Sequence, residues 1–103
     1  MDAREAEAAL AAGALALDVR EPAEWEAGHV AGALHLPLGE LGARYHELPL
    51  DRDIVCICRS GARSGQATAA LAGAGYRIAN LDTGMIGWVA AGLPLEPSDG
   101  YVA

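Results

Sequence analysis

The stretch that decides the fold is residues 54–64, IVCICRSGARS, where a short apolar run changes abruptly into small and cationic residues. Residues 54–57 are apolar and rich in β-branched side chains, the composition of a fully buried strand. After the loop, alanines and Leu71 recur at helical spacing from Gly65 to Ala74, and Gly75 follows as a helix stop. The stretch therefore predicts a central strand, a tight polar loop and a helix, in this order.

The same alternation of strand and helix extends outward to both ends of the chain. We expect strands at residues 14–19 and 76–81 with a strand-like connector at residues 32–37, and helices at residues 2–12, 39–48 and 84–91 together with a short one from Pro22 through Trp25 to Gly28. Short connections between alternating elements predict an α/β fold, a three-layer α/β/α arrangement with a mostly parallel central sheet. Since 103 residues suit one compact unit, we expect a single domain over residues 1–103.

The composition narrows the classes of partner. Seven Lys+Arg against fourteen Asp+Glu give a formal net charge of −7, which disfavours binding to nucleic acid or to an anionic membrane surface. All seven cations are arginines, so chemistry that needs a lysine amine is excluded. A chain that is 52% hydrophobic and 20% charged contains enough apolar residues for a sizeable core.

The two cysteines and the start of the chain bear on its location. The first residues are acidic rather than basic and apolar, unlike an export signal, and no uncharged run is long enough to span a membrane. We therefore expect a cytoplasmic protein in which Cys56 and Cys58 are thiols. Cys56 lies inside the apolar strand, where it is either a small buried hydrophobe or, as the alternative, a resolving or secondary thiol.

The loop after the central strand is the candidate site. Ligands of open α/β sheets bind at the carboxyl ends of the strands, where this loop lies. Its small residues let several backbone N–H groups turn inward, and the following helix adds the positive end of its dipole, which makes an anion-binding cradle. Cys58 at its start is the expected nucleophile, because such surroundings lower the pKa of a thiol. The cradle residues expected to bind substrate are Arg59, Ser60, Gly61, Ala62 and Arg63.

Residues near the loop have two interpretations each. Ser64 either donates a hydrogen bond to the thiolate or acts as an ordinary helix-start hydroxyl. Asp18 and Arg20, at the end of another strand, are expected to form a structural salt bridge or loop anchor, with direct contact to substrate as the alternative.

The remaining aromatic and histidine side chains are assigned structural roles. We expect His29 to satisfy backbone groups in a tight connection and Trp25 and Trp88 to belong to the core. The three histidines have no ligand spacing with the cysteines, so no metal site and no cofactor are expected.

On these motifs the chain resembles a single-domain rhodanese, a sulfurtransferase, over residues 14–97. The matching blocks are Leu17-Asp-Val-Arg20 with Glu24-Trp25, then Gly28-His-Val-Ala-Gly-Ala33, the cysteine loop, and Gly84 through Trp88 to Pro94. The resemblance implies that Cys58 takes the outer sulfur of a small anionic donor such as thiosulfate, forms a persulfide, and passes the sulfur to cyanide or a thiol.

The length and charge of the loop refine this resemblance. Related phosphatases space the loop as C-x5-R, whereas Cys58 and Arg63 are spaced as C-x4-R, which resembles the sulfurtransferases. The cationic loop favours thiosulfate over mercaptopyruvate as the donor. The alternative is a persulfide carrier or interaction module that delivers sulfur to an acceptor protein.

Overall fold

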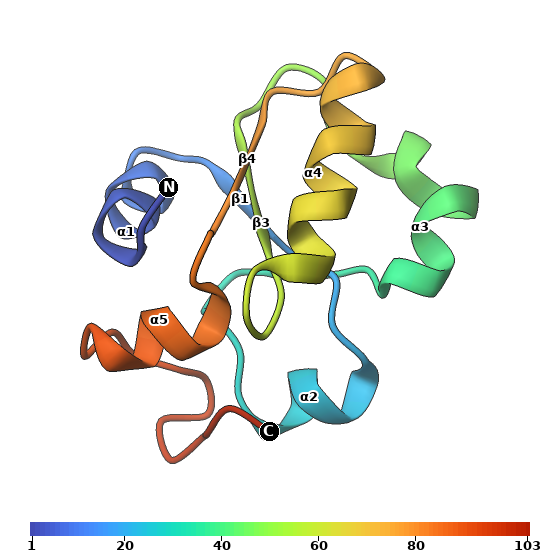
Figure 1. Cartoon of the computed structure of the whole chain (residues 1–103). Helices are drawn as coiled ribbons and strands as arrows, with labels where there is room; N and C mark the ends of the chain where they lie inside the picture. Colours follow the sequence, from blue (N-terminus) through green and yellow to red (C-terminus); the bar gives the residue numbers. More distant parts are fainter.

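Four parallel strands form the centre of the computed structural model, which describes residues 1–103 (Figure 1). The sheet order is β2-β1-β3-β4, and each neighbouring pair runs parallel. The strands are β1 (Leu15–Asp18), β2 (Leu34–His35), β3 (Ile54–Ile57) and β4 (Ile78–Asn80). The predicted parallel sheet is therefore confirmed, with 54–57 as one of its two inner strands.

Helices cover both faces of this sheet. Figure 1 shows α3 and α4 on one side and α1 and α5 on the other, so the predicted three-layer arrangement is confirmed. The helices are α1 (Ala3–Ala11), α2 (Pro22–Ala27), α3 (Leu38–Arg44), α4 (Ala62–Gly73) and α5 (Gly84–Ala90), with a short 3-10 turn at Tyr45–Glu47. None of them is long and apolar enough to cross a bilayer.

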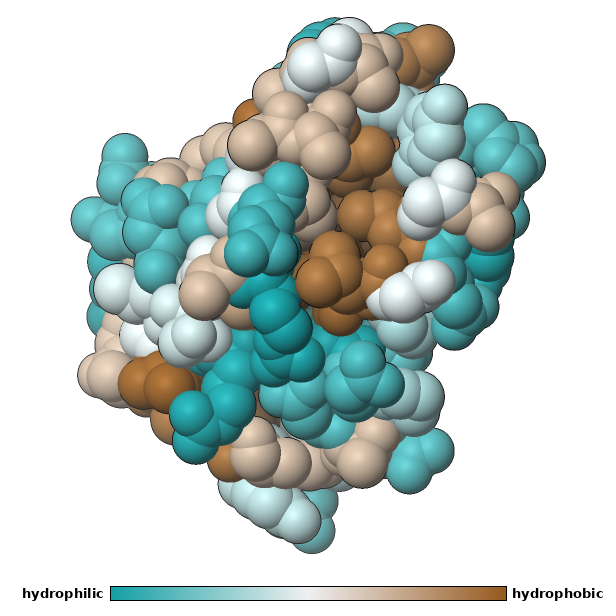
Figure 2. Space-filling model, turned by 45° about the vertical axis from the view of Figure 1, so that its right-hand side comes forward, coloured by the Kyte–Doolittle hydropathy of each residue, from teal (hydrophilic) through white to brown (hydrophobic).

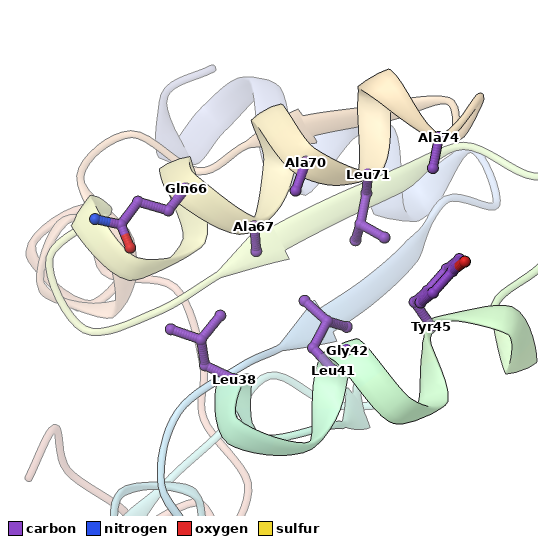
Figure 3. A pocket seen from close by; sticks show the side chains of 9 residues that line it. All are labelled: Leu38, Leu41, Gly42, Tyr45, Gln66, Ala67, Ala70, Leu71 and Ala74. Carbon is purple, nitrogen blue, oxygen red and sulfur yellow. The ribbon is translucent and has the colours of Figure 1, made fainter.

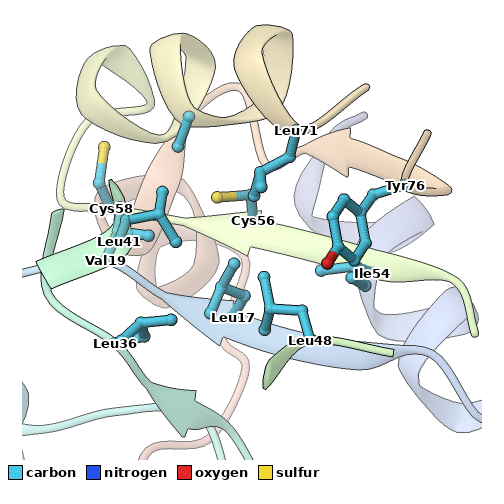
Figure 4. Packing of buried hydrophobic residues seen from close by; sticks show 11 residues of the cluster. Leu17, Val19, Leu36, Leu41, Leu48, Ile54, Cys56, Cys58, Leu71 and Tyr76 are labelled. Carbon is cyan, nitrogen blue, oxygen red and sulfur yellow. The ribbon is translucent and has the colours of Figure 1, made fainter. Parts of the chain in front are cut away.

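Strand β3 divides the core into two clusters. Its side chains alternate, so that Cys56 and Cys58 face α3 and α4 while Val55 and Ile57 face α1 and α5. Both faces are covered, which is why all four residues of β3 are buried and the sequence shows no polar alternation there. Figure 4 shows the two cysteine sulfurs on the α4 side of the strand, with Cys58 one residue beyond its end.

Two expectations about individual elements need correction. The connector at 32–37 contains only two strand residues, because Pro37 has no N–H to extend the ladder. Trp25 is not a core residue: it lies half-buried on α2, and its ring stacks on those of His29 and His35 at centroid distances of 3.6 and 4.8 Å.

Two other structural roles agree with expectation. Trp88 is 4% exposed, and its indole N–H donates to the carbonyl of Pro94 at 2.8 Å. The Nδ1 atom of His29 lies 2.9 Å from the carbonyl oxygen of Trp25, so the ring provides a hydrogen-bond partner for this backbone group.

Candidate active site

The carboxyl ends of β1 and β3 meet at one edge of the sheet, as they must when neighbouring strands run parallel. Helix α2 follows β1 at this edge, and the loop at residues 58–61 follows β3 and leads into α4 (Figure 1). The start of α5 also lies here, because its first N–H groups bond to the same loop. The edge therefore combines a cysteine loop with the first turns of three helices.

Cys58 occupies the centre of this loop and is only 1% exposed. Its Sγ accepts hydrogen bonds from the backbone N–H of Gly61 at 3.0 Å and from the hydroxyl of Ser64 at 3.3 Å. Burial by itself raises the pKa of Cys58, but the Ser64 hydroxyl and the backbone N–H groups of Ser64, Gly61 and Ser60 outweigh it, so the pKa is lowered. The loop thus stabilises a thiolate without a neighbouring base.

Two glycines allow the loop to take this shape. Gly61 has φ +98°, and a Cβ there would overlap the backbone carbonyl of Asp82. Gly84 has φ +60°, and a Cβ there would overlap the carbonyls of Cys58 and Arg59. The close approach lets the N–H of Met85 donate to the Cys58 carbonyl at 2.9 Å.

Helix α5 orients the peptides of the loop through these contacts. A second one runs from the N–H of Ile86 to the carbonyl of Arg59 at 3.1 Å. The carbonyl of Arg59 and the N–H of Ser60 share one peptide plane, so this contact orients one of the N–H groups that act on the sulfur. The contacts between α5 and the loop were not predicted from the sequence, although Gly84 at the start of a predicted helix was a signal for them.

The lowered pKa gives a prediction for the reactivity of Cys58. The rate of alkylation by iodoacetamide follows the thiolate fraction, so it should reach half its maximum below pH 8.5, the ordinary value being about 8.5. Ser64→Ala removes one hydrogen bond to the thiolate and should move this midpoint upward. The measurement is the alkylation rate of Cys58 against pH by mass spectrometry. A wild-type rate that rises only above about pH 8.5 would show that the loop does not stabilise the anion.

Cys56 has the opposite environment. Its side chain is fully buried, and this burial raises the pKa of Cys56 to about 12. Almost no thiolate exists at neutral pH, which favours the interpretation of Cys56 as a small buried hydrophobe.

Arg63 does not project freely into the cradle. Its guanidinium donates to both carboxylate oxygens of Glu24, at 2.7 and 2.8 Å, which joins the first turn of α4 to α2. These hydrogen bonds lower the pKa of Glu24 to about 2, so the carboxylate stays ionised at neutral pH. Glu24 was not predicted as a site residue, because its partner lies 39 residues away and the spacing along the chain does not indicate the contact.

The other predicted cradle residues lie along the rim. Arg59 is exposed, and its Nε donates to the backbone carbonyl of Ala103 at 2.9 Å. Ser60 and Ala62 are also exposed, and Ala62 is the first residue of α4. Both arginines that were expected to bind substrate thus have a hydrogen-bond partner within the chain.

Asp18 and Arg20 form a fully buried ion pair. The guanidinium donates to both carboxylate oxygens, with a shortest distance of 2.8 Å, and also to the carbonyl of Gly28 at 2.8 Å. The pair fixes the end of β1 to the residue that closes α2. This geometry corresponds to the expected loop anchor.

The largest cavity of the molecule lies away from these residues. It is an apolar groove of about 460 Å³ between α3 and α4, visible as the hollowed brown area in Figure 2 and in close-up in Figure 3. The lining residues are Leu38, Leu41, Gly42, Tyr45, Gln66, Ala67, Ala70, Leu71 and Ala74. None of the predicted site residues is among them, so cavity size does not locate the chemistry here.

No group of three His, Cys, Asp or Glu side chains converges closely enough to hold a metal ion. The chemistry available at this edge is therefore that of an activated thiol among backbone N–H donors and arginines.

Comparisons with known proteins point to the same chemistry. A family model for the rhodanese-like domain matches residues 2–91. A sulfurtransferase of Allochromatium vinosum is 47% identical over 87 residues, which cover 84% of this chain and 81% of the relative. The protein YrkF of Bacillus subtilis, named as a candidate sulfur carrier, is 41% identical over 73 residues, and the match spans only 40% of its length.

Among solved structures, a rhodanese-related protein of Thermoplasma volcanium superimposes with a TM-score of 0.88. It is 30% identical in sequence, and the match covers 92% of this chain and 94% of that one.

Proposed function

The chain belongs to the rhodanese-like family, and from this premise we propose that it transfers a sulfane sulfur through a persulfide on Cys58. Family membership and the sulfurtransferase relative support sulfur transfer as the general activity. The observation that carries the proposal is the hydrogen bonding of the Cys58 sulfur, which lowers the pKa of a thiol that burial alone would keep neutral. The two unpaired cysteines further support a cytoplasmic location.

The proposed reaction has two steps, each balanced in atoms and charge. In the first, the Cys58 thiolate attacks the outer sulfur of thiosulfate, an S–S bond forms at Sγ, and sulfite leaves with the electron pair of the broken S–S bond. In the second, cyanide or a thiolate attacks the outer sulfur of the persulfide, and Cys58 leaves as a thiolate. The thiolate that the loop stabilises is thus both the nucleophile and the leaving group.

The buried position of Sγ is compatible with this route. A persulfide places its outer sulfur about 2 Å from Sγ. That outer atom carries the negative charge and remains within reach of the loop N–H groups. An acceptor then has to reach only the outer sulfur.

The proposed donor is a small anion, with thiosulfate as the first candidate. The backbone N–H groups of the loop and the guanidinium of Arg59 on its rim are the groups available to attract it. Arg63 contributes as part of an ion pair rather than as a free cation.

Incubation with thiosulfate should therefore load one sulfur on the protein. We expect a mass increase of one sulfur atom on the peptide that contains Cys58, and treatment with cyanide should remove it as thiocyanate. Intact-protein and peptide mass spectrometry measure both steps. A protein that remains unloaded by thiosulfate, and also by other sulfane donors, would refute the persulfide proposal.

A second candidate function is delivery of sulfur to an acceptor protein. It is favoured by the similarity to YrkF, which is named as a candidate sulfur carrier. The test compares the rates at which a co-purifying protein and cyanide remove sulfur from the loaded chain. Faster transfer to the protein supports the carrier, and transfer only to small acceptors supports the enzyme.

A further inference from the structure

The ion pair between Glu24 and Arg63 joins α2 to the first turn of α4, directly after the cysteine loop. Arg63 precedes Ser64, whose hydroxyl bonds to the Cys58 sulfur. The pKa of Arg63 is raised mainly by its hydrogen bonds to Glu24, and the charge of Cys58 adds a smaller contribution. The side chains of Arg63 and Glu24 are 35% and 17% exposed, so solvent only partly screens the pair. The charge of Glu24 is therefore felt at the site as well as the charge of Arg63.

The pairing changes the electrostatics that a donor meets. A guanidinium and a carboxylate joined by two hydrogen bonds carry no net charge together, whereas Arg63 alone would carry +1. The Coulomb energy between a site and a donor is proportional to the charge of the donor. Removing a carboxylate from the site should therefore increase the logarithm of kcat/KM twice as much for a dianionic donor as for a monoanionic one.

Resting on the proposed sulfur transfer by Cys58, we infer that Glu24 sets the donor specificity of the site by neutralising Arg63 and thereby discriminating against dianionic sulfane donors in favour of monoanionic ones. Glu24 is in this sense a specificity-determining residue that acts through Arg63. Singly charged donors, such as organic thiosulfonates and persulfides, lose less from this neutralisation than thiosulfate does. Thiosulfate, a dianion, is accepted but disfavoured by this pair.

The experiment compares two donors of different charge on four forms of the protein. The donors are thiosulfate and methanethiosulfonate, a monoanion that transfers the same outer sulfur and releases methanesulfinate. The forms are wild type, Glu24→Gln, Arg63→Gln and the double variant. Glu24→Gln should raise kcat/KM about fivefold for thiosulfate and about twofold for methanethiosulfonate. Arg63→Gln should lower the two kcat/KM values by similar factors. The double variant should restore the wild-type ratio of kcat/KM for thiosulfate to kcat/KM for methanethiosulfonate.

The ratio of the two kcat/KM values is the decisive readout, because it does not depend on the fraction of folded protein. Glu26→Gln is the matched control: it removes a carboxylate from the same helix, but Glu26 is exposed and forms no ion pair. It should leave the ratio unchanged. The change caused by Glu24→Gln should also shrink as ionic strength increases, because salt screens the charge.

Two outcomes would overturn the inference, and they differ from failure of the proposed function. Equal fold-changes for both donors in Glu24→Gln and Arg63→Gln would show that the pair only holds α2 against α4. A ratio that moves as much in the Glu26 control would show a general effect of net charge. If neither donor loads sulfur on wild-type Cys58, the proposed function itself fails.

Discussion

Cys58→Ser should abolish sulfur loading, whereas Cys56→Ala should retain most of it. A serine hydroxyl is far less acidic than a thiol, and its oxygen forms no persulfide, so transfer should fall by at least about a thousandfold. Cys56 is fully buried, with a pKa raised to about 12 by that burial, and supplies no thiolate at neutral pH. The measurement is thiocyanate production together with the mass of the loaded protein.

The control separates chemistry from packing, because both cysteines belong to the same core cluster. Cys56→Ala removes a buried sulfur from this cluster without introducing a buried hydroxyl. It therefore shows how much the loss of a buried sulfur alone lowers the free energy of unfolding. Sulfur loading that survives in Cys58→Ser would show that Cys58 is not the nucleophile. Loading that disappears in a folded Cys56→Ala would show that Cys56 is required for it.

Arg20→Ala should be the most destabilising of the arginine substitutions. It leaves the fully buried carboxylate of Asp18 without its partner, a change that typically costs about 3–5 kcal/mol in the free energy of unfolding. Arg77→Ala is the matched control, because the pair of Arg77 with Asp53 has side chains that are 57% and 68% exposed, and such pairs contribute at most about 1 kcal/mol. Denaturation in urea measures both.

A double variant tests the physical reason. Asp18→Asn combined with Arg20→Met removes both charges, so it should lose less stability than Arg20→Ala alone. If Arg20→Ala and Arg77→Ala lose similar amounts, the buried pair is not the anchor between β1 and the end of α2.

The elements around the loop were the most predictable from the sequence. Residues 54–57 were recognisable as a buried strand because both faces of β3 are covered, which requires a continuous apolar run. The polar loop after it, and a helix after that, are local patterns of small residues and helical spacing. The resemblance to the rhodanese family was confirmed by the family model.

The side-chain partners could not be predicted in the same way. Spacing along the chain does not show that Arg63 reaches Glu24 on α2, because the contact depends on how two helices meet at the sheet edge. The prediction that Trp25 belongs to the core was wrong for a related reason. Helix α2 is short, and the Trp25 ring packs against His29 and His35 near the surface. Long-range geometry of this kind has no periodic signature.

The hydrogen bonds from α5 to the loop carbonyls affect the energetics of each turnover. The N–H of Ser60, one of those that act on Cys58, is aligned when Ile86 bonds to the Arg59 carbonyl of the same peptide, which happens as the chain folds. Dipoles that are already aligned need not reorient when negative charge moves from Sγ to the outer sulfur of a persulfide and back. Water molecules would have to reorient in every catalytic cycle, whereas the protein dipoles are oriented once, when the chain folds. The barrier to sulfur transfer is lower by the reorganisation energy that is avoided.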